Sequence, residues 1–138
     1  MSEELDSIVE FSSNIKDQDQ PDPLPAGKYV GTIRDVEVKM SQRETKYAAI
    51  SFFVGADQFP ADWKDGNPDG MTLVYRRVGL EDTANSRFGL RRFCESIGAP
   101  MAKKIDTAEW VGMEGLLDVG HDTYEGVTRA NIERVSEA

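Results

Sequence analysis

The feature that most constrains the fold is residues 26–54, where β-branched and aromatic residues alternate along two arms. In the first arm Tyr29, Gly31 and Ile33 share one side, and after Asp35 the apolar residues move to the opposite phase. A period of two is typical of a strand, and a slip by one residue predicts a β-bulge.

The second arm continues the same pattern and completes a hairpin. Four apolar residues share one of its faces: Ala48, Ile50, Phe52 and Val54. The linker 40–45 is polar, with a lysine at each end, Lys39 and Lys46. We therefore predict two long antiparallel strands joined by a flexible basic loop. A long, bent first hairpin with glycine at its start is typical of small Greek-key barrels.

The remaining elements follow in an informative order. Residues 71–78 alternate as a third strand, with Met71, Leu73, Tyr75 and Arg77 on one face. Residues 85–97 place Leu90, Phe93, Cys94 and Ile97 at helical spacing, with Phe88 beside them, and Gly98 ends this helix. Residues 110–120 and 127–135 are strands four and five, separated by a turn at 122–126, with inward Leu117, Val119, Ile132 and Val135. The chain is predicted to be mainly β, a five-stranded OB-fold Greek-key barrel with one α-helix between strands 3 and 4.

The Asp-rich segment 55–70 is predicted to be a long loop. Residues 65–70 match the first six positions of a calcium-binding EF-hand loop, but the twelfth position holds Arg76 instead of glutamate. A cation there repels calcium, so a turn built from Asp, Asn and Gly is favoured over a calcium site.

The formal net charge of −9 is unevenly distributed. Residues 1–23 contain seven acids and one lysine, whereas residues 24–138 are close to balance. We predict a mostly disordered acidic tail over 1–23 and a folded domain over 24–138. Either the tail is simply solvated, or its apolar residues form an amphipathic docking segment: Leu5, Ile8, Val9, Phe11 and Ile15.

Several functional classes find no support in the sequence. A single cysteine excludes an internal disulfide and a Cys-rich metal site, and Cys94 fits a core position. His121 has no nucleophile or acid spaced for a triad, and no glycine loop cradles a phosphate. No apolar run approaches the length needed to span a membrane, and we see no signal-peptide pattern at the start of the sequence. We expect a cytoplasmic protein without a cofactor that is not an enzyme, although a nuclease with scattered carboxylates stays as an alternative.

Basic and aromatic residues recur together on the predicted strands. The pairs are Lys28 with Tyr29, Lys46 with Tyr47, Tyr75 with Arg76 and Arg77, and Tyr124 with Arg129 across the last turn. Single-stranded nucleic acid is held by rings that stack on bases and cations that follow phosphates. The alternative is that the tyrosines half-bury at sheet edges while the arginines keep the surface soluble. Taken as a set on a barrel, they favour binding.

Short motifs add a family resemblance over about residues 22–135. Leu-Pro-Ala-Gly-Lys-Tyr at 24–29, Ser-Ile-Gly at 96–98 and Tyr-Glu-Gly-Val-Thr-Arg-Ala-Asn-Ile at 124–132 resemble a family of small bacteriophage OB-fold single-stranded DNA-binding proteins. The resemblance implies sequence-nonspecific coating of single strands during phage DNA replication, recombination or repair in the infected bacterial host. It implies a binding face on strands one to three that includes Lys28, Arg34, Lys39, Arg43, Lys46, Tyr47, Tyr75, Arg76 and Arg77.

The sequence departs from proteins of this kind in one respect. Their partner-recruiting acidic tail is often C-terminal, whereas here the acidic segment is N-terminal. We expect residues 1–22 to compete with DNA and to recruit replication or recombination proteins. The rival interpretation is an acidic protein-interaction module, or an inhibitor that mimics DNA and blocks a host factor. The oligomeric state is not specified, and a homodimer through barrel edges is compatible with the sequence.

Overall fold

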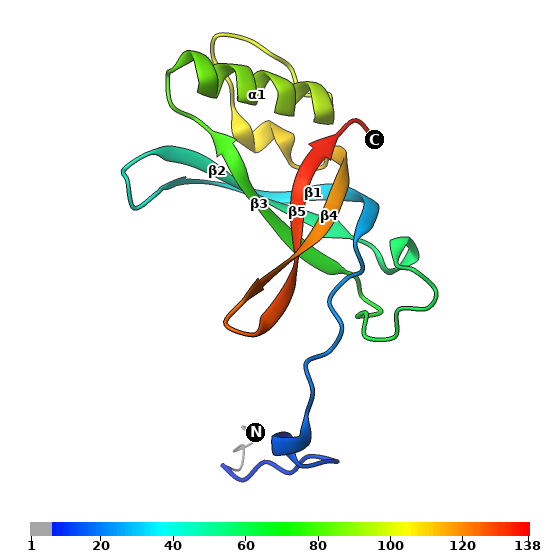
Figure 1. Cartoon of the computed structure of the whole chain (residues 1–138). Coiled ribbons are helices and arrows are strands. Elements are labelled where there is room, and N and C mark those ends of the chain that lie inside the picture. Colours follow the sequence, from blue (N-terminus) through cyan, green and yellow to red (C-terminus); the bar gives the residue numbers. More distant parts are fainter. Residues whose placement is uncertain (1–6) are drawn as a thin grey trace, which may run out of the picture.

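A five-stranded antiparallel sheet forms the body of the computed structural model, which describes residues 7–138 (Figure 1). The strand order is β3-β2-β1-β4-β5. The elements are β1 (Gly27–Met40), β2 (Lys46–Val54), β3 (Met71–Gly79), α1 (Ala84–Ile97), β4 (Glu114–Tyr124) and β5 (Val127–Ser136), with 3₁₀ turns at Ile15–Asp17, Ala56–Gln58 and Thr107–Trp110. The prediction of a mainly β chain with one helix is confirmed. No helix within residues 7–138 is long and apolar enough to cross a membrane.

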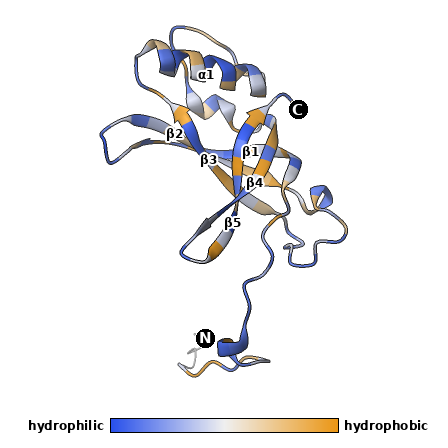
Figure 2. Ribbon diagram, viewed as in Figure 1, coloured by the Kyte–Doolittle hydropathy of each residue, from blue (hydrophilic) through white to orange (hydrophobic). Residues whose placement is uncertain are grey.

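The first hairpin forms as the alternation predicts. Ile33 pairs with Phe52 and Asp35 with Ser51, so Arg34 is the extra residue of a bulge in β1. The loop between the strands is a turn closed by Ser41, whose backbone N–H donates to the Thr45 carbonyl at 2.8 Å. The Ser41 and Thr45 hydroxyls also share a hydrogen bond. In Figure 2 this hairpin end is largely hydrophilic and projects from the body.

A second bulge interrupts β3 and overturns part of its predicted alternation. Tyr75 pairs with Ile50 and Val78 with Ala48, so Arg76 and Arg77 together stand opposite the single residue Ala49. The phase changes there, and Val78 is buried rather than facing outward as the strict alternation predicts. Bulges re-aim side chains and increase local twist. Two successive arginines are therefore placed at a bend of the strand.

The sheet curls so that its two outer strands, β3 and β5, approach each other below the helix. Figure 1 shows the arrows of both strands pointing toward α1. The Arg77 guanidinium of β3 donates a hydrogen bond to the Glu133 carbonyl of β5 at 3.3 Å. Glu133 is itself the extra residue of a third bulge, because Asp118 pairs with Arg134 and Val119 with Ile132. The core inside this curl includes side chains from every strand and from α1.

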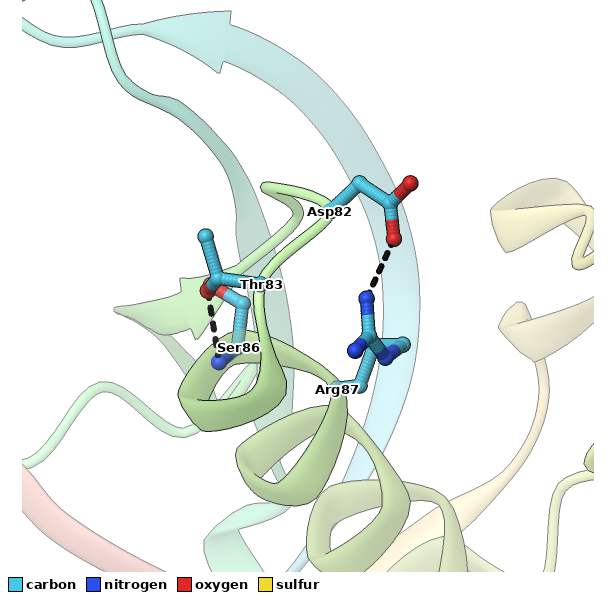
Figure 3. A network of polar contacts seen from close by, with 4 residues as sticks. All are labelled: Asp82, Thr83, Ser86 and Arg87. Atoms are coloured by element: carbon cyan, nitrogen blue, oxygen red, sulfur yellow. Dashed lines mark hydrogen bonds and ion pairs between the residues drawn. The ribbon is translucent and has the colours of Figure 1, made fainter.

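Helix α1 begins and ends with standard capping interactions. The Thr83 hydroxyl accepts a hydrogen bond from the Ser86 N–H at 3.2 Å, and Arg87 pairs with Asp82 just before the helix (Figure 3). Gly98 ends the helix in the left-handed conformation, at φ 73°. The predicted buried stripe is confirmed for Phe93, Cys94 and Ile97, with Leu90 half-buried. Phe88, predicted beside it, is 58% exposed.

The fourth strand starts later than predicted. Trp110, expected at the beginning of that strand, lies in the preceding 3₁₀ turn and is buried against Phe93. The strand continues to Tyr124, and a two-residue turn of Glu125 and Gly126 joins it to β5. Both turn residues have positive φ, 52° and 79°. Such a turn matches the twist of its strands, so the predicted 122–126 turn shortens to two residues.

The Asp-rich loop holds the end of the acidic tail. The Trp63 indole N–H donates to the Asp22 carbonyl at 2.9 Å, and the Asp22 N–H donates to the Asp65 carboxylate at 2.7 Å. Within the loop, Asn67 accepts a hydrogen bond from the Asp69 N–H, which is the expected Asx turn. The predicted apolar tail residue Leu5 lies outside the described residues.

The tail also follows the β4–β5 hairpin. The Gln20 side-chain amide donates to the Thr128 carbonyl and accepts from the Thr128 N–H. Further along, Leu24 is 1% exposed in the core, and its carbonyl is 2.7 Å from His121 Nε2. The chain is therefore attached to the body from about residue 20 onward, slightly before the predicted domain boundary at residue 24.

Candidate nucleic-acid interface

A groove runs between the β1–β2 turn and β3, and four of the predicted binding residues line it. We call it the hairpin groove; its volume is about 570 Å³. The four predicted residues come from β2 and β3: Lys46, Tyr47, Arg76 and Arg77. The remaining lining residues are Ser41, Gln42, Thr45, Gly79, Glu81 and Ser86. Residues that are 30 positions apart in the sequence thus meet in one place.

Tyr47 is the aromatic side chain of this groove. It lies on the outward face of β2, between Lys39 of β1 and Gly79 of β3 in the strand register. Because Gly79 has no side chain, no neighbour on β3 covers the ring from that position. Tyr47 is half-buried, which fixes the ring while leaving part of its surface accessible. A partly held ring is suited to stacking on a planar partner.

Three cations line the groove together with this tyrosine, and one acid accompanies them. Among the ion pairs of residues 7–138, none involves Lys46, Arg76 or Arg77. The only acid that lines the groove is Glu81, whose carboxylate accepts a hydrogen bond from the Lys46 backbone N–H at 2.5 Å. The groove is therefore positive within a chain whose net charge is −9. A phosphate bound there would meet three cations and one carboxylate, that of Glu81, so the net interaction is attractive.

Predicted residues on β1 lie outside this groove. Arg34, in the bulge, places its guanidinium 3.5 Å from the centre of the Phe53 ring. Lys39 pairs with Glu37 at 3.2 Å on the exposed surface. Lys28 is exposed near the start of the strand, and Arg43 is exposed in the β1–β2 turn. None of these four residues lines the hairpin groove, although Arg43 follows the lining residue Gln42 in the turn.

Two predicted tyrosines are turned toward the interior. Tyr29 is 4% exposed, and its hydroxyl donates to the Pro25 carbonyl at 2.7 Å. Burial, reinforced by the Asp62 carboxylate, raises the pKa of Tyr29. Its ring belongs to the core and is unavailable for stacking. Tyr75 is half-buried and stacks on Phe93 with ring centres 6.1 Å apart; burial raises its pKa, opposed by the nearby Arg77 charge.

The last predicted pair lies on the other hairpin. Tyr124 is 78% exposed at the β4–β5 turn, and Arg129 is exposed opposite Asp122. Figure 1 shows the ends of the two hairpins well separated. Tyr124 and Arg129 therefore lie away from the hairpin groove and do not line it.

The sequence interpretation missed the polar lining of the groove. Ser41 and Thr45 were treated as linker residues, although their hydroxyls close the turn that forms one wall. Glu81 lies between β3 and the helix in a segment without periodicity, and Ser86 lies in the predicted helix but off its apolar stripe, so no pattern marks either residue. Only the curvature of the hairpin brings them together.

Residues 7–138 contain no group of three or more His, Cys, Asp or Glu side chains arranged to hold a metal ion. No protein-family model matches the sequence, and no curated protein matches it significantly.

Proposed function

We propose that this protein binds single-stranded DNA without sequence preference, with the hairpin groove as its primary site. The observation that carries the proposal is the convergence of one accessible tyrosine and three unpaired cations in a single groove. Stacking and phosphate contacts work on any base, so this combination binds single strands generally. A duplex keeps its bases stacked on one another, so it offers the tyrosine no free base face.

We also propose that the curled sheet is an OB-type barrel. The order β3-β2-β1-β4-β5, the approach of β3 to β5 and the position of α1 after β3 support this assignment. In OB folds the second and third strands and the loop that joins the first two commonly contact oligonucleotides. The hairpin groove is built from those parts of this chain.

In the proposed complex, Tyr47 stacks on one base while Lys46 and Arg76 contact the flanking phosphates. Arg77, held by its hydrogen bond to the Glu133 carbonyl, keeps further N–H groups for another phosphate, because a guanidinium has five donors. Each stacked base contributes about 1–3 kcal/mol. Phosphate contacts release counterions, so the affinity should fall as the salt concentration rises.

The decisive experiment is a fluorescence-anisotropy titration of labelled oligo-dT and of duplex DNA at low and moderate salt. We expect preferential, salt-sensitive binding to the single strand. The double variant Lys46→Gln/Arg76→Gln should weaken that binding, whereas Lys103→Gln/Lys104→Gln, with the same charge change outside the groove, should affect it much less. Absence of binding by the full chain and by a chain lacking residues 1–19 would refute the proposal.

The acidic tail favours a second role, recruitment of a partner protein. Val9, Phe11 and Ile15 are 67%, 63% and 72% exposed on a tail that also carries Glu10 and Asp17. We propose that this segment docks on replication or recombination proteins. Retention of such a protein on immobilised chain after nuclease treatment, with loss in Phe11→Asp, would support it. Equal retention by wild type and Phe11→Asp would contradict it.

A further inference from the structure

A second basic groove lies between α1 and the adjacent ends of β3 and β5, and we call it the arginine groove. Its volume is about 480 Å³. Arg77 of β3, Arg92 of α1 and Arg134 of β5 line it, so three separate elements each contribute a guanidinium. None of the sequence patterns draws attention to Arg92 or Arg134, because neither stands beside an aromatic residue on a predicted strand.

The charges of this groove are only partly compensated. Arg134 lies 3.9 Å from Asp118, at the outer limit of an ion pair. Arg92 has no ion pair within residues 7–138, and its guanidinium lies 6.0 Å from the centre of the Phe88 ring. Two acids also line the groove, but the Glu95 carboxylate is engaged by Arg91 at 2.9 Å, which leaves Glu137 near the chain end.

Contacts between α1 and the strands hold the walls of the groove. The Ser96 hydroxyl donates to the Arg92 carbonyl of α1 at 2.9 Å and also lies 3.2 Å from the Val135 carbonyl of β5, while Tyr75 stacks on Phe93 beneath. Gly89, in the middle of α1, faces this groove, and a methyl group added there would meet no atom within 4 Å. Glycine inside a helix is destabilising, and no contact within the protein requires it here. The position instead keeps the helix surface low along the groove.

Arg77 lines both grooves, so the two are neighbours that share one cation. We propose that the arginine groove binds backbone phosphates of the same single strand that occupies the hairpin groove. The strand would pass over the β3 bulge at Arg77 and continue between α1 and β5. This inference rests on the proposed function and adds the helix to the binding surface.

The test is the length dependence of oligo-dT binding at fixed salt. We would compare strands of about four and about twelve nucleotides, within the range of site sizes seen for OB folds. The variant Arg92→Gln/Arg134→Gln should bind the short strand as wild type does, and the long strand at least tenfold more weakly. Its salt dependence on the long strand should be shallower by up to about 1.4, for two lost contacts at about 0.7 each.

The matched control is Lys103→Gln/Lys104→Gln, which makes the same charge change at residues that line neither groove, and it should keep the length dependence. A charge-neutral test is Gly89→Gln, which should obstruct the groove and weaken only long-strand binding, with Gly89→Ala close to wild type. Thermal unfolding of each variant confirms that it is folded.

The outcomes separate the two proposals. If wild type binds no oligo-dT of either length, both fail. If Lys46→Gln/Arg76→Gln weakens binding while Arg92→Gln/Arg134→Gln binds the long strand normally, the hairpin groove stands and the arginine groove is overturned. If the arginine-groove and control variants lose the same affinity for both lengths, long-range charge explains the effect and the inference also fails.

Discussion

Arg77 and Glu133 connect the two outer strands of the sheet, because the Arg77 guanidinium donates to the Glu133 carbonyl across 3.3 Å. Both residues lie in bulges, one in β3 and one in β5. The strands β3 and β5 are not paired as neighbours in the sheet. The two bulges instead bring the Arg77 donor and the Glu133 acceptor together. The same arginine lines both grooves, so one side chain takes part both in the contact between the outer strands and in the candidate binding surface.

Replacement of Arg77 by alanine should therefore affect both stability and binding. We expect the free energy of unfolding to fall by about 0.5–1.5 kcal/mol, the usual net value of one hydrogen bond. Arg76→Ala, which removes the neighbouring cation, should leave the stability within about 0.5 kcal/mol of wild type because Arg76 is an exposed residue without such a contact. Urea unfolding measures the difference. Equal stability losses in the two variants would contradict the role assigned to Arg77.

Truncation of Tyr47 tests the stacking part of the proposed function. Tyr47→Ala should weaken oligo-dT binding by about 5- to 150-fold, which corresponds to about 1–3 kcal/mol for one stacked base. Tyr47→Phe should retain most of the affinity because the ring remains. Tyr124→Ala, which removes an exposed tyrosine on the other hairpin, is the matched control and should bind normally. Equal losses for Tyr47→Ala and Tyr124→Ala would contradict the assignment of the primary site to the hairpin groove.

Gly89 gives a prediction about stability alone. Gly89→Ala should raise the free energy of unfolding by about 0.5–1 kcal/mol, since alanine is the better helix former and the added methyl group meets open space. Gly98→Ala, in contrast, should lower it because that residue has φ +73°. Chemical denaturation of both variants distinguishes the two backbone environments. A destabilised Gly89→Ala protein would show that the helix is constrained in some other way.

Alkaline pH should destabilise the fold. Burial raises the pKa of Tyr29, Tyr75 and Cys94 above their usual values of 10.0, 10.0 and 9.0. A group whose pKa is higher in the folded state contributes full stability below its unfolded pKa and loses it as the pH rises further. The free energy of unfolding should thus decline from about pH 9 upward. Tyr75→Phe should show a shallower decline, and an unchanged slope would argue against burial of the phenol.

Removal of the acidic tail should strengthen DNA binding. A chain that starts at residue 20 keeps Gln20, Asp22 and Leu24, which attach the segment to the body, but loses the acids before them. Because those acids repel phosphate and can compete for the basic groove, the gain should be largest at low salt and vanish at high salt. Anisotropy titrations at two salt concentrations measure it. Unchanged or weaker affinity at low salt would contradict competition by the tail.

The sequence predicts the strands and the helix of this fold because the spacing of apolar residues shows which side of each element is buried. The β1 bulge is visible since the apolar phase shifts after Asp35, and the end of α1 is marked by Gly98. The β3 bulge cannot be predicted from the sequence, because the two residues that form it, Arg76 and Arg77, are both charged and show no shift in the apolar pattern. Trp110 was assigned to a strand because a large apolar residue before Leu117 fits either a strand or a buried turn.

In the candidate site, too, the apolar pattern predicts some features and misses others. Tyr29 shares the phase of Ile33, so its burial was implied by the alternation even though Lys28 stands beside it. Tyr47 has the opposite phase to Ala48 and Ile50, and it lies on the outer face. The groove forms where β2, β3 and the β1–β2 turn meet. This meeting depends on the curvature of the sheet, which no local sequence pattern predicts. Arg92 and Arg134 were missed for that reason.

The attachment of Gln20 to Thr128 has a consequence for how copies of this chain behave at high concentration. The Gln20 amide occupies both the N–H and the carbonyl of an outer-strand residue, as a neighbouring strand would. Unpaired groups along an outer strand are where foreign strands add and aggregation starts. The Gln20 side chain therefore covers both backbone groups of Thr128, and we expect its removal to leave that part of β5 open to strand addition by another copy of the chain.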